Sequence, residues 1–208
     1  MYNPPQFTIT DDAQIAALCA AHPLATLVTM SDTGLRADHI PLLQDGGDFI
    51  GHVALANDLH RVVTADTPAL AVFRAAEGYV SPNWYPSKAR DHKAVPTWNY
   101  QVVQVHGHLA FSHKNADKRR VVSRLTGVFE RQTNGAQAWR MGDAPADYLQ
   151  DMLDHIVAFR LRVTRLEAKF KLSQNRDAAD IAGVIQGSED SANPDLAQAM
   201  RALPRDPL

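Results

Sequence analysis

The clearest pattern in the chain is an alternation of apolar and polar residues between positions 101 and 112. One set of alternate positions carries Val103, Val105, Gly107, Leu109 and Phe111. The other set carries Gln104, His106 and His108. Successive side chains of a strand point to opposite faces, so a period of two predicts a half-buried strand here.

Similar strand patterns recur along the chain and are separated by turn sequences. The predicted strands cover residues 24–30, 35–43, 48–54, 69–74, 101–112 and 156–166. Ser-Asp-Thr-Gly at 31–34 and Asp-Gly-Gly-Asp at 45–48 are typical of tight hairpin turns. About six antiparallel strands, mostly joined by hairpins, indicate an α+β chain that is mainly β, with a closed or nearly closed barrel and helices outside it.

Helical spacing of apolar residues appears between these strands and after them. It predicts helices over about 12–22, from 57, over 115–131 and over 145–155. In the short helix after 57 we expect Leu59, Val62 and Val63 to point inward. After residue 177 the pattern predicts a short helix, a Gly- and Ser-containing linker at 187–191, and a last helix after Pro194. We therefore expect a main domain over 1–176 and a helical tail over 177–208.

Length and composition limit the class of protein. A chain of 208 residues with 45% hydrophobic residues can build one substantial core. No apolar run approaches the ~20 residues that cross a membrane, and the first residues lack the parts of a secretion signal. We expect a soluble, cytoplasmic protein with no membrane partner. The single cysteine, Cys19, lies among helical apolar residues, so we expect it to be buried filler.

Net charge gives no general reason to bind nucleic acid, because the formal charge is -2. The one cationic cluster lies in the predicted helix over 115–131 and just before it. It consists of Lys114, Lys118, Arg119, Arg120 and Arg124. A solvated helix face is the simpler interpretation. A DNA-facing surface over 114–124 is the alternative, although no helix-turn-helix pattern accompanies it.

The segment from Tyr79 to Tyr100 has the composition of a binding-site wall. It holds two Trp, three Tyr and several Pro residues, with Ser, Thr, Asn and Lys side chains between them. Aromatic faces supply apolar area and small polar groups supply directed hydrogen bonds, so the segment suits a flat polar heterocycle. The alternative is a rigid loop that only caps a core.

Several familiar sites lack their motifs. The chain has no Gly-x-Gly-x-x-Gly, no phosphate-binding Gly-Lys-Ser/Thr and no Gly-x-Ser-x-Gly sequence. Nine histidines invite a metal hypothesis, and His106 and His108 share one strand face. Without a cysteine or carboxylate at motif spacing, we expect no metal site. No side chain stands out as catalytic.

A series of short blocks resembles the PaiB family. They are Tyr2-x-Pro4, Ala25-Thr-Leu-Val-Thr29, His39-Ile-Pro-Leu42, Gly51-His-Val-Ala-x-x-Asn57, Tyr79-Val-Ser-Pro-x-Trp-Tyr85, Val95-Pro-Thr-Trp-Asn-Tyr100 and Lys169-Phe-Lys-Leu-Ser-Gln-Asn-Arg176. They follow one another in family order over most of the chain. The family is described as FMN-binding negative transcriptional regulators on a split β-barrel.

The resemblance implies a homodimer that binds FMN in a groove between subunits. Haem or another flat ligand stays open as an alternative. For the phosphate the candidate cations are Arg61, Lys88 and Lys171, with Ser81 and Thr97 as hydroxyl donors. The remaining candidates for the ring and ribityl chain are His39, His52, Asn57, Trp84, Tyr85, Trp98, Asn99, Tyr100, Gln174 and Asn175. Gln174 and Asn175 could instead satisfy the loop backbone.

The chain departs from the family pattern after Asn57, where Asp58-Leu59-His60-Arg61 replaces a proline and an aromatic residue. Leu55 stands where a basic residue is common in the family, so either flavin affinity is weaker in this chain or Arg61 or Arg74 supplies the missing charge. Two function hypotheses remain. The first is negative regulation of transcription, and the second is an FMN-dependent oxidoreductase that passes electrons from a nicotinamide to a small acceptor.

Overall fold

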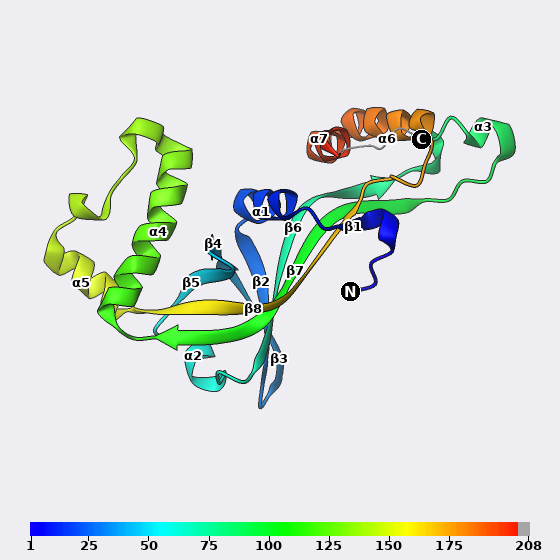
Figure 1. Ribbon diagram of the computed structural model, residues 1–208. Helices are drawn as coiled ribbons and strands as arrows, with labels where there is room; N and C mark the ends of the chain where they lie inside the picture. The colour runs from blue at the N-terminus through cyan, green and yellow to red at the C-terminus, as the bar shows by residue number, and fades with distance from the viewer. Residues whose placement is uncertain (204–208) are drawn as a thin grey trace. The chain divides into compact units, whose positions relative to one another are not determined.

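The computed structural model describes residues 1–203, and its main element is an antiparallel sheet of eight strands (Figure 1). The strands are β1 (Thr8–Ile9), β2 (Leu24–Ser31), β3 (Gly34–Pro41), β4 (Leu43–Asp45), β5 (Asp48–Ala54), β6 (Pro68–Val80), β7 (Thr97–Ser112) and β8 (Ile156–Lys171). Their hydrogen-bonded order is β3-β2-β6-β7-β8-β5-β4, and β1 pairs with β8. The order of strands does not close on itself. The sheet has more strands than the six expected because it includes the short strands β1 and β4.

Seven α-helices lie in the described part of the chain. They are α1 (Asp12–Ala21), α2 (Leu59–Val62), α3 (Lys88–Asp91), α4 (Asn115–Asn134), α5 (Ala146–Asp154), α6 (Ala178–Asp190) and α7 (Pro194–Ala202). Short 3-10 turns are η1 (Pro5–Phe7), η2 (Pro82–Trp84), η3 (Gly135–Gln137) and η4 (Met141–Asp143). Asp11 caps α1, since its carboxylate accepts the N–H groups of Ala13 and Gln14.

The chain forms two compact units. Unit 1 contains Met1–Leu18, Arg74–Val103 and the chain from Glu167 onward. Unit 2 contains Cys19–Phe73 and Gln104–Leu166. The long strands β6, β7 and β8 contribute residues to both units. The predicted boundary between 176 and 177 stays a prediction, and the predicted tail is described only as far as residue 203.

The inward face predicted for residues 101–112 is confirmed. Val103, Val105 and Leu109 are buried, with at most 1% of each side chain exposed. At Gly107 the neighbouring strand excludes any side chain, because a Cβ there would lie 2.0 Å from the carbonyl oxygen of Arg162. The close approach of β7 to β8 therefore leaves no room for a side chain at this position.

Hairpin pairing in unit 2 follows the predicted turns. β2 pairs with β3 from Leu24↔Pro41 to Ser31↔Gly34, and β4 pairs with β5 from Leu43↔Ile50 to Asp45↔Asp48. The long-range neighbour of β5 is β8, from Phe49↔Leu161 to Ala54↔Ile156. Four residues, Ile50, Val121, Leu125 and Ala158, form a core where α4 covers this part of the sheet. Leu59 in α2 and Val63 just after it are buried as expected, but Val62 is exposed, so its predicted orientation is wrong.

Four predicted boundaries near the site segments are wrong. β6 continues to Val80, beyond its predicted end at 74. β7 begins at Thr97, so the sequence Thr-Trp-Asn-Tyr lies in a strand. β8 continues to Lys171, beyond its predicted end at 166. α6 runs through the predicted linker at 187–191 as far as Asp190. In each case, strand pairing or helix packing extends the element into a segment whose own sequence only weakly favours that structure.

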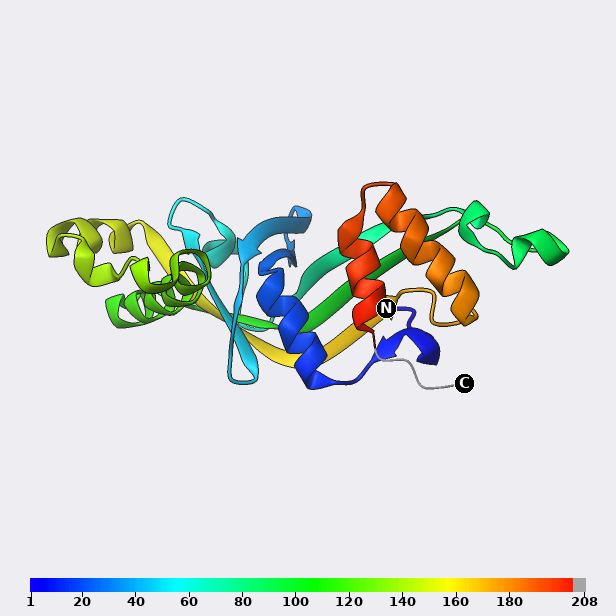
Figure 2. The same ribbon diagram turned by 90° about the horizontal axis from the view of Figure 1, so that it is seen from above.

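In unit 1, α6 and α7 lie side by side, and α6 packs on the segment around η2 (Figure 2). The indole of Trp84 lies so close to α6 that a Cβ at Gly187 would be 2.3 Å from it. Asp180, on α6, accepts hydrogen bonds from the backbone N–H of Ser87 at 2.9 Å and from its hydroxyl at 2.7 Å. Burial opposes ionisation of Asp180, but the Ser87 bonds outweigh it and hold the pKa below its ordinary value.

Among the helices of residues 1–203, none combines the length and the apolarity that a membrane crossing requires. Cys19 is buried, and burial raises the pKa of its thiol to about 12. It is a packed apolar side chain at neutral pH, as the sequence predicts.

Candidate functional site

Unit 1 contains a small polar cavity of about 140 Å³ at the start of β7 and the end of β8. The residues that line it are Tyr85, Val95, Pro96, Thr97, Asn99, Lys171, Ser173, Asn175 and Arg176. Five of them were predicted site residues, namely Tyr85, Thr97, Asn99, Lys171 and Asn175. Segments far apart in the sequence are thus brought together by the pairing of long strands.

Asn99 is the most constrained polar residue of this cavity, because its side chain is fully buried. Its amide nitrogen donates to Ser173 Oγ at 2.9 Å and lies 3.7 Å from Met200 Sδ. Its Oδ1 atom has no hydrogen-bond partner among the described residues. A buried acceptor left unpaired costs about 1–3 kcal/mol, so the position favours a ligand or water that carries a donor.

Two cations line the cavity beside Asn99. Lys171 Nζ donates to the carbonyl oxygen of Trp98 at 2.6 Å and to Thr97 Oγ1. Burial, with the positive charge of Lys169 as a smaller cause, lowers the pKa of Lys171. The guanidinium of Arg176 stacks 4.6 Å from the ring centre of Tyr85. No acidic side chain among the described residues lines the cavity.

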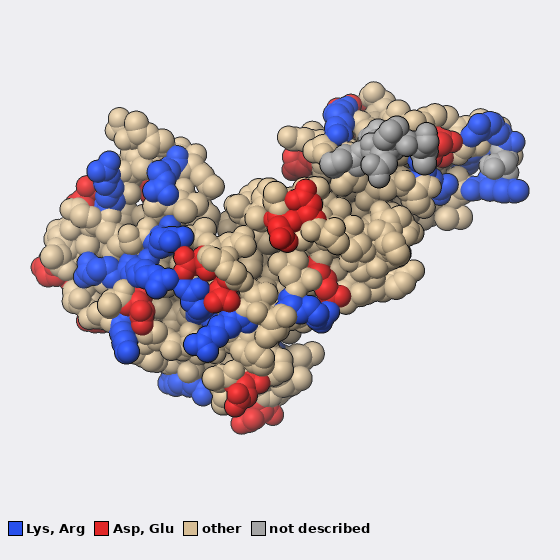
Figure 3. Space-filling view, viewed as in Figure 1, with Lys and Arg blue, Asp and Glu red and all other residues tan. Residues whose placement is uncertain are grey.

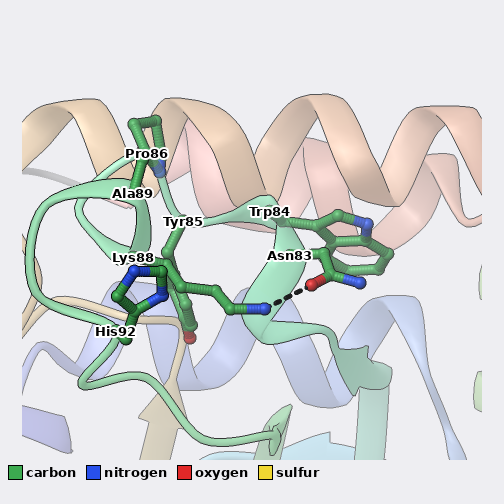
Figure 4. Close-up of a pocket in the computed structure, with 7 residues that line it drawn as sticks. All are labelled: Asn83, Trp84, Tyr85, Pro86, Lys88, Ala89 and His92. Atoms are coloured by element: carbon green, nitrogen blue, oxygen red, sulfur yellow. Dashed lines mark hydrogen bonds between the residues drawn. The ribbon is translucent and has the colours of Figure 1, made fainter.

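A larger, open hollow lies on the other part of the same segment, with a volume of about 370 Å³ (Figure 4). Its lining residues are Asn83, Trp84, Tyr85, Pro86, Lys88, Ala89 and His92. Lys88 Nζ donates to Asn83 Oδ1 at 2.6 Å, as the dashed line in Figure 4 marks. Tyr85 lines both this hollow and the small cavity, so the two hollows adjoin at Tyr85.

The predicted aromatic wall is only partly available to a ligand. Trp98 and Tyr79 are each about half exposed, and their rings meet edge to face at 6.3 Å. Trp84 packs on α6, and Tyr100 lies 5.4 Å below the ammonium of Lys169. Trp98 is therefore the predicted indole that presents the most free surface.

Two further predicted residues hold the backbone. Ser81 Oγ accepts the N–H of Asn83 at 3.2 Å, which caps η2. Gln174 accepts the N–H of Leu172 at 2.7 Å and donates to the carbonyl of Phe170. Of the two roles left open for Gln174, the structure contains the backbone one. Cofactor contact by either residue stays a prediction.

Four predicted residues lie in unit 2. Asn57 Oδ1 accepts from Arg36 at 2.8 Å and from the N–H of Leu59 at 2.9 Å, and its amide donates to Asp38 at 3.0 Å. This network organises the turn before α2. His39 lies 3.2 Å from Thr26 Oγ1 and is exposed, as is Arg61.

His52, the fourth of these residues, is partly buried. Its Nδ1 atom has no partner in the described residues, and burial lowers its pKa. His52 and Asn99 thus share one property, which is a buried polar atom that no protein group satisfies. Such atoms are uncommon in native proteins, where a bound water or ligand usually satisfies them.

Two residues of the small cavity, Ser173 and Arg176, are not among the predicted site residues. Ser173 has φ 66°, the left-handed conformation, and this turn aims its hydroxyl at Asn99. Both residues fall within the Lys169–Arg176 block, so the family resemblance was the available signal. Nothing in the local sequence marks the left-handed turn, because Ser rarely adopts it.

Three basic side chains of α4 are paired with other groups of unit 2. Asp45 accepts from Arg120 at 2.7 Å, lies 3.2 Å from Arg124, and also pairs with Arg160. Lys118 is buried and donates to the carbonyl of Leu153 at 3.1 Å. Figure 3 shows acidic side chains among the Lys and Arg side chains on this part of the surface. The helix therefore offers less free positive charge than its sequence suggests.

The histidine pair predicted to share a strand face does not form a metal centre. Within the described stretch, no group of three or more His, Cys, Asp or Glu side chains gathers closely enough to hold a metal ion. A guanidinium nitrogen of Arg165 lies 3.0 Å from Nε2 of His106. A cationic neighbour disfavours a bound metal cation at this ring.

Comparison with known proteins gives consistent results. The family described as "Putative FMN-binding domain" matches residues 1–165. The Protease synthase and sporulation protein PAI 2 of Bacillus subtilis is 30% identical over 212 residues, which cover all of this chain and 98% of that protein.

Solved structures support the fold. A FAD and haem binding protein from Mycobacterium smegmatis aligns with a TM-score of 0.59 and 19% identity, over 84% of this chain and 78% of that one. A flavocytochrome from Azotobacter vinelandii aligns with a TM-score of 0.59 and 14% identity, over 85% and 75%. The split-barrel fold expected from the sequence is confirmed. By its family match over most of its length and its full-length relative, this chain belongs to the FMN-binding domain family, and its cofactor is FMN.

Proposed function

We propose that unit 1 holds FMN along the Tyr79–Tyr100 segment, with the pyrimidine edge of the ring in the small cavity. The observation that carries this is the unpaired, buried Oδ1 of Asn99 beside the cations Lys171 and Arg176. The pyrimidine edge of a flavin presents one N–H donor, at N3, between two carbonyl acceptors. That order complements one acceptor surrounded by donors.

The same observation argues against a phosphate in this cavity. A phosphate is an anion with acceptor oxygens only, so it would face Asn99 Oδ1 without any donor between them. Lys171 therefore suits a contact with the flavin ring better than a contact with the phosphate. When bound, FMN supplies a ring that accepts and releases hydride or single electrons. A cation beside the pyrimidine edge favours negative charge on that ring.

For the phosphate we propose Lys88, in the open hollow. FMN is an extended molecule whose phosphate lies at the opposite end from the pyrimidine edge, and Tyr85 lines both hollows. Lys88 Nζ makes one hydrogen bond, to Asn83 Oδ1, and an ammonium has three donors. Arg61 is the competing cation.

We further propose that the working form is a homodimer. An open hollow and a half-exposed Trp98 do not enclose a ring, whereas ligand sites usually bury most of their ligand. A second copy that covers this face would complete the enclosure. The exposed apolar side chains of Tyr79, Val95 and Trp98 suit such an interface.

Flavin titrations of the apoprotein test the two placements separately. Wild type should bind FMN and riboflavin, and it should bind N3-methylriboflavin, which lacks the donor, at least about tenfold more weakly. Lys171→Met should weaken FMN and riboflavin by the same factor, about tenfold. Lys88→Met should weaken FMN alone. Lys114→Met is the control. It removes an exposed charge, and Lys114 lines neither of the two hollows.

Two results would overturn the placement. Equal affinity for riboflavin and N3-methylriboflavin would exclude Asn99 from the ring site. A Lys171→Met variant that loses FMN but keeps riboflavin would move the phosphate into the small cavity. If Arg61→Met rather than Lys88→Met shows the loss for FMN alone, the phosphate belongs to unit 2.

In the cell, we propose that the FMN-bound protein acts as a negative transcriptional regulator. The family resemblance and the full-length relative, whose name refers to protease synthesis and sporulation, support this role. A second candidate is an FMN-dependent oxidoreductase. The pairing of Arg120 and Arg124 with Asp45 favours it over the regulator, because it reduces the free positive charge of α4, the candidate DNA-facing helix.

Two assays on the same flavin-loaded preparation separate these roles. Anaerobic NADH or NADPH should bleach the visible band of an oxidoreductase within seconds, and an added acceptor should restore the band repeatedly. A regulator should instead shift a fragment of its own promoter region, and added salt should weaken that shift. Turnover without a shift would refute the regulatory role.

A further inference from the structure

A third hollow lies in unit 2, apart from every residue assigned to the flavin. It has a volume of about 200 Å³. Its lining residues come from β5, β7, α4 and β8, and they combine arginine side chains with aromatic and aliphatic ones. Nothing in the family match assigns a function to this set.

The polar side of the hollow has three guanidinium groups. Arg120 and Arg160 share Asp45, and Arg160 also lies 3.3 Å from Asp48. Arg162 is exposed, and its side chain has no hydrogen bond or ion pair among residues 1–203. Because a guanidinium carries five N–H donors, Arg120 also keeps donors beyond its one bond to Asp45.

The one acidic residue of the lining already accepts a hydrogen bond. Asp117 accepts the hydroxyl of Ser112 at 2.5 Å. With three arginines against Asp117, the lining itself is cationic. Its charge is concentrated at Arg162, which is the arginine that a bound anion could approach without displacing Asp45.

The opposite side of the hollow is apolar. The ring centres of Phe111 and Phe159 lie 5.8 Å apart with a tilt of 58°, and the buried residues Ile50, Val121 and Ala158 line the same hollow. The hollow therefore combines an arginine rim with an aromatic and aliphatic floor. This pairing of surfaces matches a molecule that has one anionic group and a small apolar body.

We propose that this hollow binds a small organic acid, with its carboxylate at Arg162 and its apolar body against Phe111 and Phe159. A guanidinium fork matches the two oxygens of a carboxylate, and a ring-sized body is compatible with about 200 Å³. Inorganic phosphate is a poorer match, because it gains nothing from the apolar floor and its higher charge faces Asp117. A nucleic-acid strand exceeds this volume.

Calorimetric titration of the full-length, flavin-loaded protein tests the site, with benzoate as the probe. Benzyl alcohol is the neutral match in shape, and inorganic phosphate is the purely anionic arm. Arg162→Gln should weaken benzoate binding about tenfold or more, the loss expected for one charge-assisted contact. Arg119→Gln is the matched control, since Arg119 is an exposed arginine of α4 that does not line the hollow.

The expected result is benzoate binding to wild type and Arg119→Gln, with weak or no binding of benzyl alcohol and phosphate. Absence of any benzoate binding at millimolar concentration would overturn the proposal. So would equal benzoate affinity in Arg162→Gln, or phosphate binding as tight as that of benzoate. Because the flavin residues are elsewhere, FMN affinity should be the same in all three proteins, and its retention also verifies that they fold.

Discussion

The packing of α6 on the site segment makes a strong prediction at Gly183. A Cβ added there would lie 2.0 Å from the carbonyl oxygen of Trp84 and 3.1 Å from Pro86 Cδ. Trp84 and Pro86 flank Tyr85, which lines both hollows of the proposed FMN site. The Gly183→Ala variant therefore tests whether a C-terminal helix positions the residues of the site.

The expected size of the effect follows from two opposing contributions. Ala in place of Gly favours a helix interior by about 1 kcal/mol. Overpacking costs about 1–3 kcal/mol, and occasionally more, and here the obstacle is backbone, which cannot rotate away. A cost in the upper part of that range, less the helix gain, leaves an expected net loss of about 1–2 kcal/mol in the free energy of unfolding, together with weaker FMN binding.

Gly127→Ala in α4 is the matched control. Its Cβ would meet only the end of the flexible Arg131 side chain, at 3.2 Å from Nη1. The helix contribution should then dominate, so we expect unchanged stability or a gain of up to about 1 kcal/mol. Urea unfolding followed by circular dichroism measures both variants, and flavin titration measures the site. Wild-type stability in Gly183→Ala would refute the close packing of α6 on Trp84.

Three further predictions concern unit 2. Because burial lowers the pKa of His52, the unfolded chain binds more protons below about pH 6.5, so stability should fall as the pH drops below that value, and His52→Leu should flatten this slope in urea unfolding. Asp45→Asn should cost about 1–2 kcal/mol by unpairing Arg120, Arg124 and Arg160, and a loss that does not shrink at high salt would show that these pairs are not its cause. Val105→Asp should unfold the chain, since it buries an unpaired charge, and an unchanged melting curve would disprove the inward face of β7.

The strands of unit 2 were the most predictable part of the fold. β5 has the predicted bounds, because the Asp-Gly-Gly-Asp turn and an apolar run mark both of its ends locally. The buried face of β7 follows from alternation alone. In contrast, β7 reaches back to Thr97 and β8 on to Lys171, where pairing with other strands decides the conformation and the local pattern is weak.

The same reasoning explains the error in α6. Gly187 and Ser188 have low helix propensity, so the sequence indicates a linker. In the structure Gly187 makes room for the indole of Trp84, and the hydroxyl of Ser188 donates to the carbonyl of Val184 at 2.7 Å. Tertiary packing with a residue about a hundred positions away in the sequence, at Trp84, was not visible in the local pattern.

For the site, residue types were predictable and their individual roles were not. The aromatic and polar composition of Tyr79–Tyr100 identified the segment that contains both hollows of unit 1. The division of labour depends on packing, since Trp84 rests on α6 and Gln174 holds backbone groups, while Asn99 keeps an unpaired oxygen. These differences arise from contacts between segments, which a single sequence does not record.

Sedimentation velocity followed at the visible absorption band of the flavin tests the central claim most directly. If two copies of the chain enclose FMN, the flavin signal of the reconstituted protein should sediment with the mass of two chains, at one FMN per chain. A flavin signal that stays at the rate of free FMN, or that sediments with a single chain, would contradict the account.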